Sequence, residues 1–438
     1  MTRDVKSVAV LGGGTMGLGI AAASADAGAD VLLLDVTLEA AEASLDRMIN
    51  IRPPAFENPE SAKRIKLGSF NDDLERIADY DWICEAIIED LATKRELFAK
   101  LEPLRRDGSV VSTNTSGIPL KDIAADMPER LQKDIVVTHF FNPVKIMRLM
   151  ELIPGEKTTP DVTEALARFC GEKLGKGVVY AKDTVNFIGN RIGCFFMLSG
   201  LHKAKAALEA GMPMEKVDAL LSKPVGLPPT GLYGLIDLIG LDIMDLVGKN
   251  LKVNLPQGDV GLAYTSFPPV EQAMLERGQL GRKAKGGFYR LNIAEDGAKT
   301  KEIFDLTSES WRPQETVELS PIHQAPETVF FADDAEGQLV WDIMGGTLLY
   351  AADLIPEIAD DVVNIDRAMR WGFGWAKGPF ELLDQLGTDK VIAKLDAEGK
   401  ELPVMLKVLK DAGATSFYSE DGSKYMSRDG KWETVPSE

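Results

Sequence analysis

Cysteine is scarce in this sequence, and its few copies lie far apart. Cys84, Cys170 and Cys194 are the only three, and no two of them form a Cys-x-x-Cys pair. An odd number of distant cysteines favours neither a disulfide framework nor a zinc site. We therefore expect no metal centre and predict a reducing compartment, the cytoplasm.

Basic residues and long apolar runs are also in short supply. Lys and Arg number 49 against 68 Asp and Glu, which gives a formal charge of -19. Nucleic acids and anionic membranes would repel such a chain, so we expect neither as a main partner. No stretch approaches the roughly 18 apolar residues of a membrane span, and the N-terminus lacks the apolar core of a signal peptide.

Short β-branched runs alternate with helix-like stretches from residue 7 to about residue 183. This alternation is typical of βαβ units that build a parallel, doubly wound sheet. The predicted strands are VAVL (8–11), VLLLD (31–35), WICEAI (82–87), SVVST (109–113), DIVVTHF (134–140) and GVVYA (177–181). We predict an α/β fold in which residues 1–183 form a Rossmann-like domain, with an irregular, proline-bearing segment at 51–60.

The character of the sequence changes after Asn186, where long apolar-periodic segments predict helices and strand signals nearly vanish. At 438 residues the chain exceeds what one core usually fills, so several domains are expected. The predicted divisions are a first all-α domain at 184–292, a polar connector at 293–335 and a second all-α domain at 336–438. The tail SKYMSRDGKWETV predicts a hairpin around Asp429 and Gly430.

The two predicted helical domains are related by an internal repeat. KVDALLSKPVGLPPTGLYGLIDLIG (216–240) resembles NIDRAMRWGFGWAKGPFELLDQLG (364–387) when one gap is allowed. The matched pairs are Asp218 with Asp366, Gly231 with Gly378, Tyr233 with Phe380, Asp237 with Asp384 and Gly240 with Gly387. Chance similarity of amphipathic helices is the alternative, but it would not require glycines and aspartates to agree. We predict that the second domain duplicates the first.

A glycine-rich turn near the N-terminus predicts a dinucleotide site. The stretch GGGTMG follows a predicted strand and opens a helix, so its backbone amides can face a pyrophosphate. Asp35 ends the next strand, where it can bind both ribose hydroxyls and would repel a 2′-phosphate. NAD is therefore favoured over NADP; a glycine-rich turn that binds nothing is the alternative. The cofactor-binding residues predicted here are Gly12, Gly14, Thr15, Met16, Gly17 and Asp35.

Histidine is as rare as cysteine, and only one copy is placed for catalysis. His202 falls inside a predicted helix and His323 in the connector, whereas His139 ends a predicted parallel strand. Ligands bind at that edge of such sheets, and imidazole suits proton transfer from an alcohol. Glu151, embedded in LMELIP, would need a partner if buried, and His139 is the natural one. A structural histidine and a glutamate exposed on an edge strand are the alternatives.

Several longer motifs match a known family. GGGTMGLGIA, EAIIEDLATKRELF, STNTSG, HFFNPVKIMRLMEL, KDTVNFIGNR and GRKAKGGFYR occur in this order. With them the sequence resembles the NAD-dependent L-3-hydroxyacyl-CoA dehydrogenases of fatty-acid β-oxidation. The RPPAF segment, NTSG and the duplicated helical domain are most similar to the dehydrogenase part of fusion enzymes whose other part is an enoyl-CoA hydratase.

The resemblance implies roles for the residues at the strand ends. His139 would be the catalytic base and Glu151 its partner. Ser116 is similar to the serine that contacts the substrate oxygen and the nicotinamide region, although a helix cap is the alternative. Asn142 and Asn190 are similar to the amides that position nicotinamide and substrate, and either could instead be a turn or cap residue.

Further cofactor contacts are implied by the same resemblance. Glu89 and Lys94 are similar to the pair that lines the cofactor and the mouth of the pocket. Lys283 is similar to a lysine that reaches back to NAD; a solvated lysine is the alternative for both lysines. Val185 and Asn186 replace the Pro-Gly that the family usually has before its asparagine, and this departure leaves Asn190 in register.

The residues that would bind the CoA phosphates are the least determined. The helical hairpin that carries CoA contacts in single-domain members is replaced here by the segment around 51–68. Lys63, Arg64 and Lys66 are candidates, and a solvated basic turn is the alternative.

The function implied is NAD-dependent oxidation of L-3-hydroxyacyl-CoA to 3-ketoacyl-CoA. An enoyl-CoA hydratase or a thiolase is a possible partner. Because the second helical copy could cover the first, a monomer is predicted as well as a homodimer. The alternatives are a dehydrogenase of a hydroxy acid without CoA and a non-catalytic, dehydrogenase-like assembly subunit.

Overall fold

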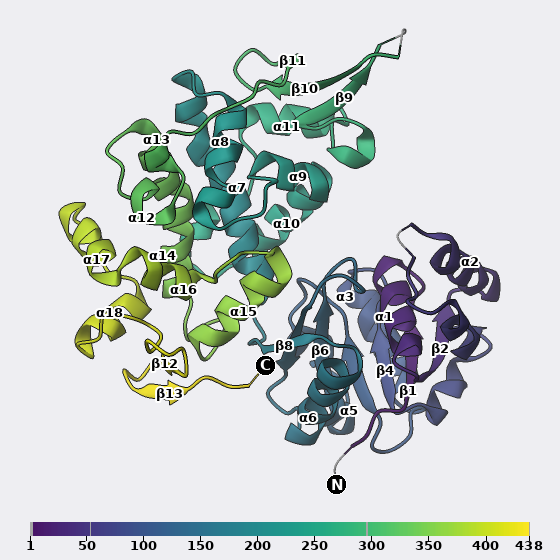
Figure 1. Cartoon of the computed structure of the whole chain (residues 1–438). Coiled ribbons are helices and arrows are strands. Elements are labelled where there is room, and N and C mark those ends of the chain that lie inside the picture. The colour runs from purple at the N-terminus through teal and green to yellow at the C-terminus, as the bar shows by residue number, and fades with distance from the viewer. Residues whose placement is uncertain (1–2, 53, 295–296, 438) are drawn as a thin grey trace. The chain divides into compact units, whose positions relative to one another are not determined.

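The computed structural model describes residues 3–52, 54–294 and 297–437, which fall into two compact units. Unit 1 comprises Met1–Ile188 with the short segments Glu357–Ala359 and Pro436–Glu438. Unit 2 comprises Gly189–Pro356 and Asp360–Val435. Figure 1 traces the chain through both units, and each is described here by itself.

Unit 1 is built on an eight-stranded sheet with the strand order β3-β2-β1-β4-β5-β6-β7-β8. The first six strands run parallel, β7 is antiparallel to β6, and β8 is parallel to β7. The bounds are β1 Ser7–Leu11, β2 Asp30–Asp35, β3 Ile65–Ser69, β4 Trp82–Glu85, β5 Val110–Thr113, β6 Ile135–Phe140, β7 Leu149–Pro154 and β8 Gly177–Tyr180. The order of the first six strands is that of a Rossmann fold, so this part of the fold prediction is confirmed.

Helices connect these strands and bury their apolar runs. Residues 8–11 of β1 and 31–34 of β2 are fully buried, as expected for parallel strands covered on both faces. The helices are α1 Thr15–Asp26, α2 Leu38–Asn50, α3 Leu91–Leu101, α4 Leu120–Ala124, α5 Glu129–Asp134 and α6 Pro160–Arg168. Shorter helical turns are η1 Pro59–Arg64, η2 Leu74–Asp79 and η3 Phe169–Lys173.

Strand β3 was not predicted from the sequence. Its residues, IKLGS, mix one lysine and one glycine with two apolar residues, and it pairs with β2 alone at the margin of the sheet. The strand begins opposite Val31, at the amino end of β2, where Arg64 lies 3.8 Å from Asp30. Ligands of such sheets bind at the carboxyl ends of the strands. Lys63, Arg64 and Lys66 as ligands of the CoA phosphates stay predictions, with a solvated basic turn as the alternative.

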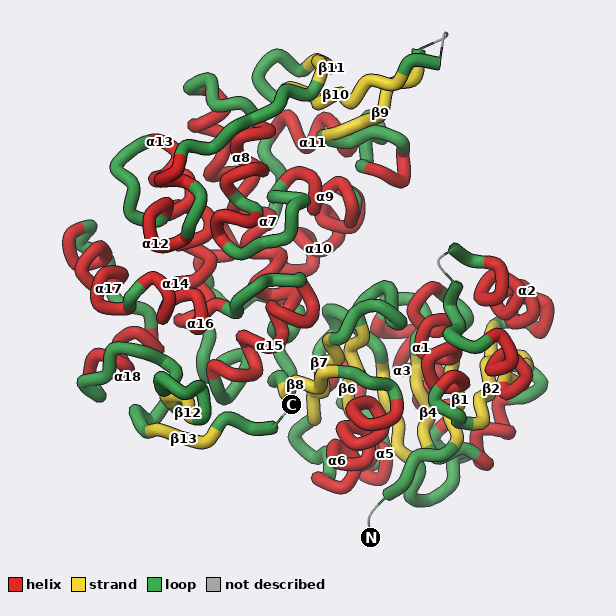
Figure 2. Tube along the Cα trace, viewed as in Figure 1, coloured by secondary structure: helices red, strands yellow, loops and turns green. Residues whose placement is uncertain are grey.

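Unit 2 is mostly helical, as Figure 2 shows in red. Its helices are α7 Gly189–Glu209, α8 Met214–Leu220, α9 Tyr233–Ile239, α10 Leu241–Asn254, α11 Pro269–Glu276, α12 Pro326–Val329, α13 Ala335–Val340, α14 Gly346–Asp353, α15 Val362–Phe373, α16 Pro379–Leu386, α17 Thr388–Ala397 and α18 Val404–Asp411. Short turns are η4 Lys223–Val225, η5 Val260–Tyr264, η6 Arg282–Ala284, η7 Pro321–His323 and η8 Trp341–Gly345. Within the described ranges, none of the helices is both long and apolar enough to cross a bilayer.

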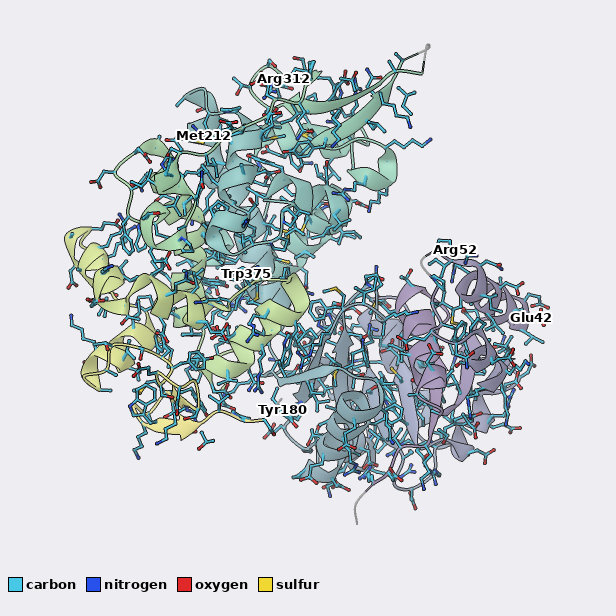
Figure 3. The ribbon with its side chains drawn as sticks, in the orientation of Figure 1. Glu42, Arg52, Tyr180, Met212, Arg312 and Trp375 are labelled. Atoms are coloured by element: carbon cyan, nitrogen blue, oxygen red, sulfur yellow. The ribbon has the colours of Figure 1, made fainter. Side chains whose placement is uncertain are left out.

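Two small antiparallel sheets accompany these helices. They are formed by β9 Tyr289–Ile293, β10 Lys299–Asp305 and β11 Ser310–Pro313, and by β12 Lys424–Met426 with β13 Trp432–Thr434. The predicted hairpin around Asp429 and Gly430 is confirmed. The three-stranded sheet was missed, because part of it falls in the stretch interpreted as a polar connector. Arg312 of this sheet, labelled in Figure 3, donates to both carboxylate oxygens of Glu215 in α8 at 2.7 Å.

The internal repeat is visible as one hydrogen-bond pattern that occurs twice. In the first copy the buried Asp218 carboxylate accepts bonds from the backbone N–H groups of Tyr233 and Gly234 and from the Tyr289 hydroxyl. Asp366 is the acceptor in the second copy. Its donors are the N–H groups of Phe380 and Glu381 and the hydroxyl of Tyr418.

A second aspartate of the repeat closes each copy. Asp237 accepts the N–H groups of Phe288 and Tyr289, both at 2.8 Å. Asp384 does the same for residues 417 and 418, at 2.7 and 2.9 Å. The matched glycines have a steric reason as well, since a Cβ on Gly231 or Gly378 would lie within 2.5 Å of the aspartate that each faces.

Helix α7 joins the two copies inside unit 2. It packs against α10 of the first copy and against α13, α14 and α15 of the second. The Arg191 guanidinium, 1% exposed, donates at 2.6 Å to the Tyr350 hydroxyl and pairs at 2.5 Å with Asp259. The Phe195 and Tyr350 rings stack at 4.0 Å between centroids. The second copy thus covers part of the first.

We expect Asp237→Ala and Asp384→Ala to destabilise unit 2 by similar amounts. Each change leaves two backbone N–H groups without their acceptor, at a cost of about 2–4 kcal/mol. Urea unfolding of the two variants measures this, with the exposed Glu401→Ala as the control expected to unfold like the native chain. A loss of stability in only one copy would contradict equivalent roles for the two aspartates.

Candidate active site

The glycine-rich turn between β1 and α1 leaves no room for larger residues. Gly12 has a φ of 110°, and a Cβ there would lie 2.6 Å from the carbonyl oxygen of Ala86, just beyond β4. A Cβ on Gly17 would lie 1.9 Å from the carbonyl oxygen of Gly12. The turn is thus held against the next strand of the sheet, and its helix against the turn.

The outer side of this turn is open. Nothing lies within 4 Å of the position that a Cβ on Gly14 would take. Gly14 caps α1 without a side-chain hydrogen bond, so the amides of the first helical turn, including those of Thr15 and Met16, remain to bind a ligand. This exposed cradle at a helix N-terminus fits the pyrophosphate of a dinucleotide.

Asp35 lies beside the turn, at the carboxyl end of β2. Its carboxylate accepts the N–H groups of Gly13 at 3.0 Å and of Val36 at 2.7 Å. Gly13, which the sequence did not single out, has no room for a side chain, because a Cβ would lie 2.5 Å from both Asp35 and Ser44. Arg47 and Ser44 of α2 donate to the Gly13 carbonyl at 2.7 and 3.0 Å. These contacts fix Asp35 next to the glycine turn.

The pair of His139 and Glu151 forms across two adjacent strands, β6 and β7 (Figure 2). The antiparallel register places the two residues directly opposite each other. Imidazole Nδ1 lies 2.6 Å from Glu151 Oε2, and Glu151 Oε1 accepts the backbone N–H of Ile188 at 3.0 Å. His139 is 3% exposed and Glu151 fully buried. The predicted pairing is therefore confirmed, and the alternative of an exposed glutamate is wrong.

The other imidazole nitrogen meets the loop that follows β5. His139 Nε2 lies 3.1 Å from the hydroxyl of Ser116, whose residue is exposed. A carboxylate at Nδ1 fixes the tautomer in which Nδ1 carries the proton. Nε2 then presents its lone pair toward the exposed loop, as a base must. Asn114 ties the loop to β6, because its Oδ1 accepts the N–H of Phe140 at 3.0 Å.

Glu89 holds this loop in place. Its Oε1 accepts the Thr115 hydroxyl at 2.6 Å and the N–H groups of Ser116 and Gly117 at 2.7 and 2.9 Å. Burial alone would raise the pKa of Glu89, but the nearby Lys94 and these donors lower its pKa below the usual value. The side chain implied to line the cofactor thus also positions Ser116.

Lys94 is buried rather than solvated. Its side chain is 1% exposed, and Nζ lies 2.7 Å from Glu85 Oε1 and 3.3 Å from Glu89 Oε2. Glu85, which is fully buried, also accepts the Thr113 hydroxyl at 2.6 Å and the N–H of Ile87 at 2.8 Å. Sequence reasoning missed Glu85, although an acid inside the apolar run WICEAI carries the same signal that pointed to Glu151.

Three further predicted site residues are described here by their local surroundings alone. Asn142 is exposed in the loop after β6. Asn190 is the second residue of α7, in unit 2. Lys283, also in unit 2, pairs with Asp242 at 2.5 Å. Their roles toward cofactor and substrate stay predictions.

The other two histidines have local structural partners. His202 Nε2 lies 2.7 Å from the carbonyl oxygen of Ser266. The His323 ring lies between the Ser320 hydroxyl and the Asp334 carboxylate, at 2.9 and 2.8 Å. Their placement agrees with the selection of His139 as the candidate base.

Comparison with known proteins leads to the same enzyme family that the sequence motifs resemble. The chain matches the models of the 3-hydroxyacyl-CoA dehydrogenase NAD binding domain over residues 7–184 and of the C-terminal domain over residues 187–291. A probable 3-hydroxyacyl-CoA dehydrogenase of Bacillus subtilis is 34% identical over 99% of this chain and 58% of its own length. A putative fatty acid oxidation complex trifunctional enzyme of Rickettsia felis is 33% identical over 93% of this chain and 57% of its own length.

The chain therefore spans less than three fifths of the length of these two relatives. Among solved structures, 3-hydroxybutyryl-CoA dehydrogenase from Escherichia coli matches with a TM-score of 0.67 at 23% identity, over 91% of this chain and 96% of that one. At this identity the likeness concerns the fold, and it extends over both helical copies.

We expect Glu89→Ala to loosen the loop that carries Ser116. The N–H of the exposed Ser116 and the part-buried N–H of Gly117 lose their acceptor, so both amides should exchange with deuterium roughly tenfold faster or more. Hydrogen exchange followed by mass spectrometry measures this. The control is Glu96→Ala, which removes only a surface pair with Lys100; equal exchange in both variants would contradict the positioning role of Glu89.

Proposed function

Because the chain belongs to the 3-hydroxyacyl-CoA dehydrogenase family, we propose that it oxidises L-3-hydroxyacyl-CoA to 3-ketoacyl-CoA with NAD in fatty-acid β-oxidation. The observation that carries this proposal is the buried pair of His139 and Glu151, which has the Ser116 hydroxyl on the outer imidazole nitrogen. A histidine held in this way can take the proton of an alcohol at neutral pH.

The residues of the pair have distinct tasks. His139 Nε2 accepts the proton of the C3 hydroxyl, and Ser116 holds the same oxygen. Glu151 keeps the imidazole in the required tautomer and stabilises the positive charge that the proton brings. Bound NAD+ supplies the acceptor for the hydride that leaves C3.

The cofactor is held by the glycine turn and by Asp35. The open cradle at Gly14 would hold the pyrophosphate, and the Asp35 carboxylate would accept hydrogen bonds from the ribose hydroxyls, which would favour NAD over NADP. From the family resemblance we also propose roles in binding cofactor and substrate for Asn142, Glu89 and Lys94 of unit 1 and for Asn190 and Lys283 of unit 2. Positioning of C3 against the nicotinamide by these groups contributes much of the rate.

We also propose partners, an oligomeric state and a cellular location for the enzyme. Since the chain spans 57% of a relative named a trifunctional fatty acid oxidation enzyme, an enoyl-CoA hydratase is the partner that we propose, either fused or separate, and a thiolase is a further candidate. The second helical copy covers the first, and we propose a monomer or a homodimer. The three buried, free thiols fit a cytoplasmic location.

The sharpest test of the base is His139→Gln, which keeps size and polarity but removes the proton acceptor. Turnover of a 3-hydroxyacyl-CoA should fall by about 100-fold to 10,000-fold, whereas the dissociation constant for NADH, measured by fluorescence titration, should change little. His202→Gln is the matched control and should retain turnover. Near-native turnover of His139→Gln would refute the assignment of the base.

The substrate class is tested with a series of 3-hydroxyacyl-CoAs and the corresponding free 3-hydroxy acids, four to sixteen carbons long. We expect NADH formation only with the thioesters, and its slope along the series reports the chain-length preference. Activity with the free acids alone would favour a dehydrogenase of non-CoA substrates. No NADH with any compound would favour the assembly subunit instead.

A further inference from the structure

The chain leaves unit 1 through an unusual backbone turn. Asn186 and Phe187 have φ values of 61° and 50°, two successive residues in the left-handed region that are not glycine. Both are buried, at 3% and 0% exposure. The left-handed conformation is unfavourable for both residues, more for a bulky side chain than for asparagine. Such a turn persists only where the surroundings hold it.

The turn lies against the pair of His139 and Glu151. The Phe187 ring lies 5.4 Å from the imidazole of His139, between ring centroids. The next residue, Ile188, donates its backbone N–H to Glu151 Oε1 at 3.0 Å, while Glu151 Oε2 takes His139 Nδ1. One carboxylate thus meets the imidazole and the end of the turn at the same time.

The start of the turn is fixed to unit 1 independently. The carboxylate of Asp183 accepts the N–H groups of Leu120 and Lys121, at 2.6 and 2.7 Å, where α4 begins. The N–H of Lys182 donates to the carbonyl of Ile358 at 2.9 Å. With the start fixed in this way, the left-handed pair determines where Phe187 and Ile188 arrive.

We propose that Asn186 is a positioning residue of the active site, whose left-handed backbone directs the Ile188 amide onto Glu151 and the Phe187 ring onto His139. Asparagine adopts this conformation more readily than other residues with a side chain. Glycine adopts it still more readily. The role of the site itself rests on the proposed function.

The consequence for the pair is electrostatic. The Ile188 N–H donates to a fully buried carboxylate and stabilises its charge. Without this donor, Glu151 holds the imidazolium proton of His139 more strongly. The acidic limb of the activity profile, which reports loss of the base by protonation, then moves to higher pH.

The test compares Asn186→Val, in which β-branching disfavours the left-handed turn, with Asn186→Gly, which restores it. For Asn186→Val we expect a fall of kcat of roughly tenfold or more and a shift of the acidic limb of kcat/KM upward by about half a pH unit or more. Asn186→Gly should rescue both quantities. Glu309, exposed in unit 2, is also a left-handed residue, with a φ of 50° against 61° for Asn186, so Glu309→Val is the control for backbone strain alone.

A second readout does not depend on turnover. With only three histidines in the chain, the imidazole resonances can be assigned by His→Gln variants, and the titration of His139 followed directly by NMR. If Asn186→Val and the milder Asn186→Ala leave this titration and kcat as in the native chain, the positioning role is overturned. A shifted titration in a protein that oxidises no 3-hydroxyacyl-CoA would support the positioning role and overturn the proposed function.

Discussion

Burial of the Glu151 carboxylate is the constraint on which the rest of the site depends. A fully buried carboxylate without donors would cost on the order of several kcal/mol. Two donors offset this cost, the imidazole of His139 and the backbone N–H of Ile188. They come from separate parts of the chain, so the fold must reverse once after β6 and return once more after β8. The carboxylate and these two donors all belong to the last third of the Met1–Ile188 segment of unit 1.

The sheet uses its two strand directions for different purposes. Parallel strands bring the glycine turn, Asp35 and the loop with Ser116 to one edge, where a cofactor can lie across them. The reversed strand β7 does something that a parallel neighbour could not do, because it sets Glu151 directly opposite His139 from a short connection. The candidate base and its partner thus lie on two strands next to the loops that can bind ligands.

The sequence was most informative where a polar residue stands in an apolar context. Glu151 in LMELIP and His139 at a strand end were predicted on that ground, and Glu85 in WICEAI could have been found in the same way. The glycines and aspartates of the repeat were found because they recur. Tyr289 and Tyr418, which donate to the first aspartate of each copy, lie beyond the aligned stretches and were therefore not found.

Other parts of the site could not be predicted from the type of residue present. The contribution of Ile188 is a backbone N–H, which every residue except proline offers, and that of Gly13 is the absence of a side chain. The three-stranded sheet at 289–313 was missed because its first strand is half-buried or exposed along its whole length, so that no apolar alternation marks it. The roles of Asn190 and Lys283, which lie in the other unit, remain predictions.

The hydrogen bond from Lys182 to Ile358 affects the order in which the protein can fold during its synthesis on the ribosome. A chain emerges from its N-terminus, and its domains tend to fold in that order. All eight strands of the large sheet precede residue 182, yet the acceptor for this amide is made only after the whole first helical copy and the beginning of the second. The nascent protein can therefore hold an assembled sheet while the segment next to the His139 pair has its Asp183 contacts but still lacks the contact with Ile358. The contacts around the His139 pair are therefore completed late in synthesis, long after the glycine turn has formed.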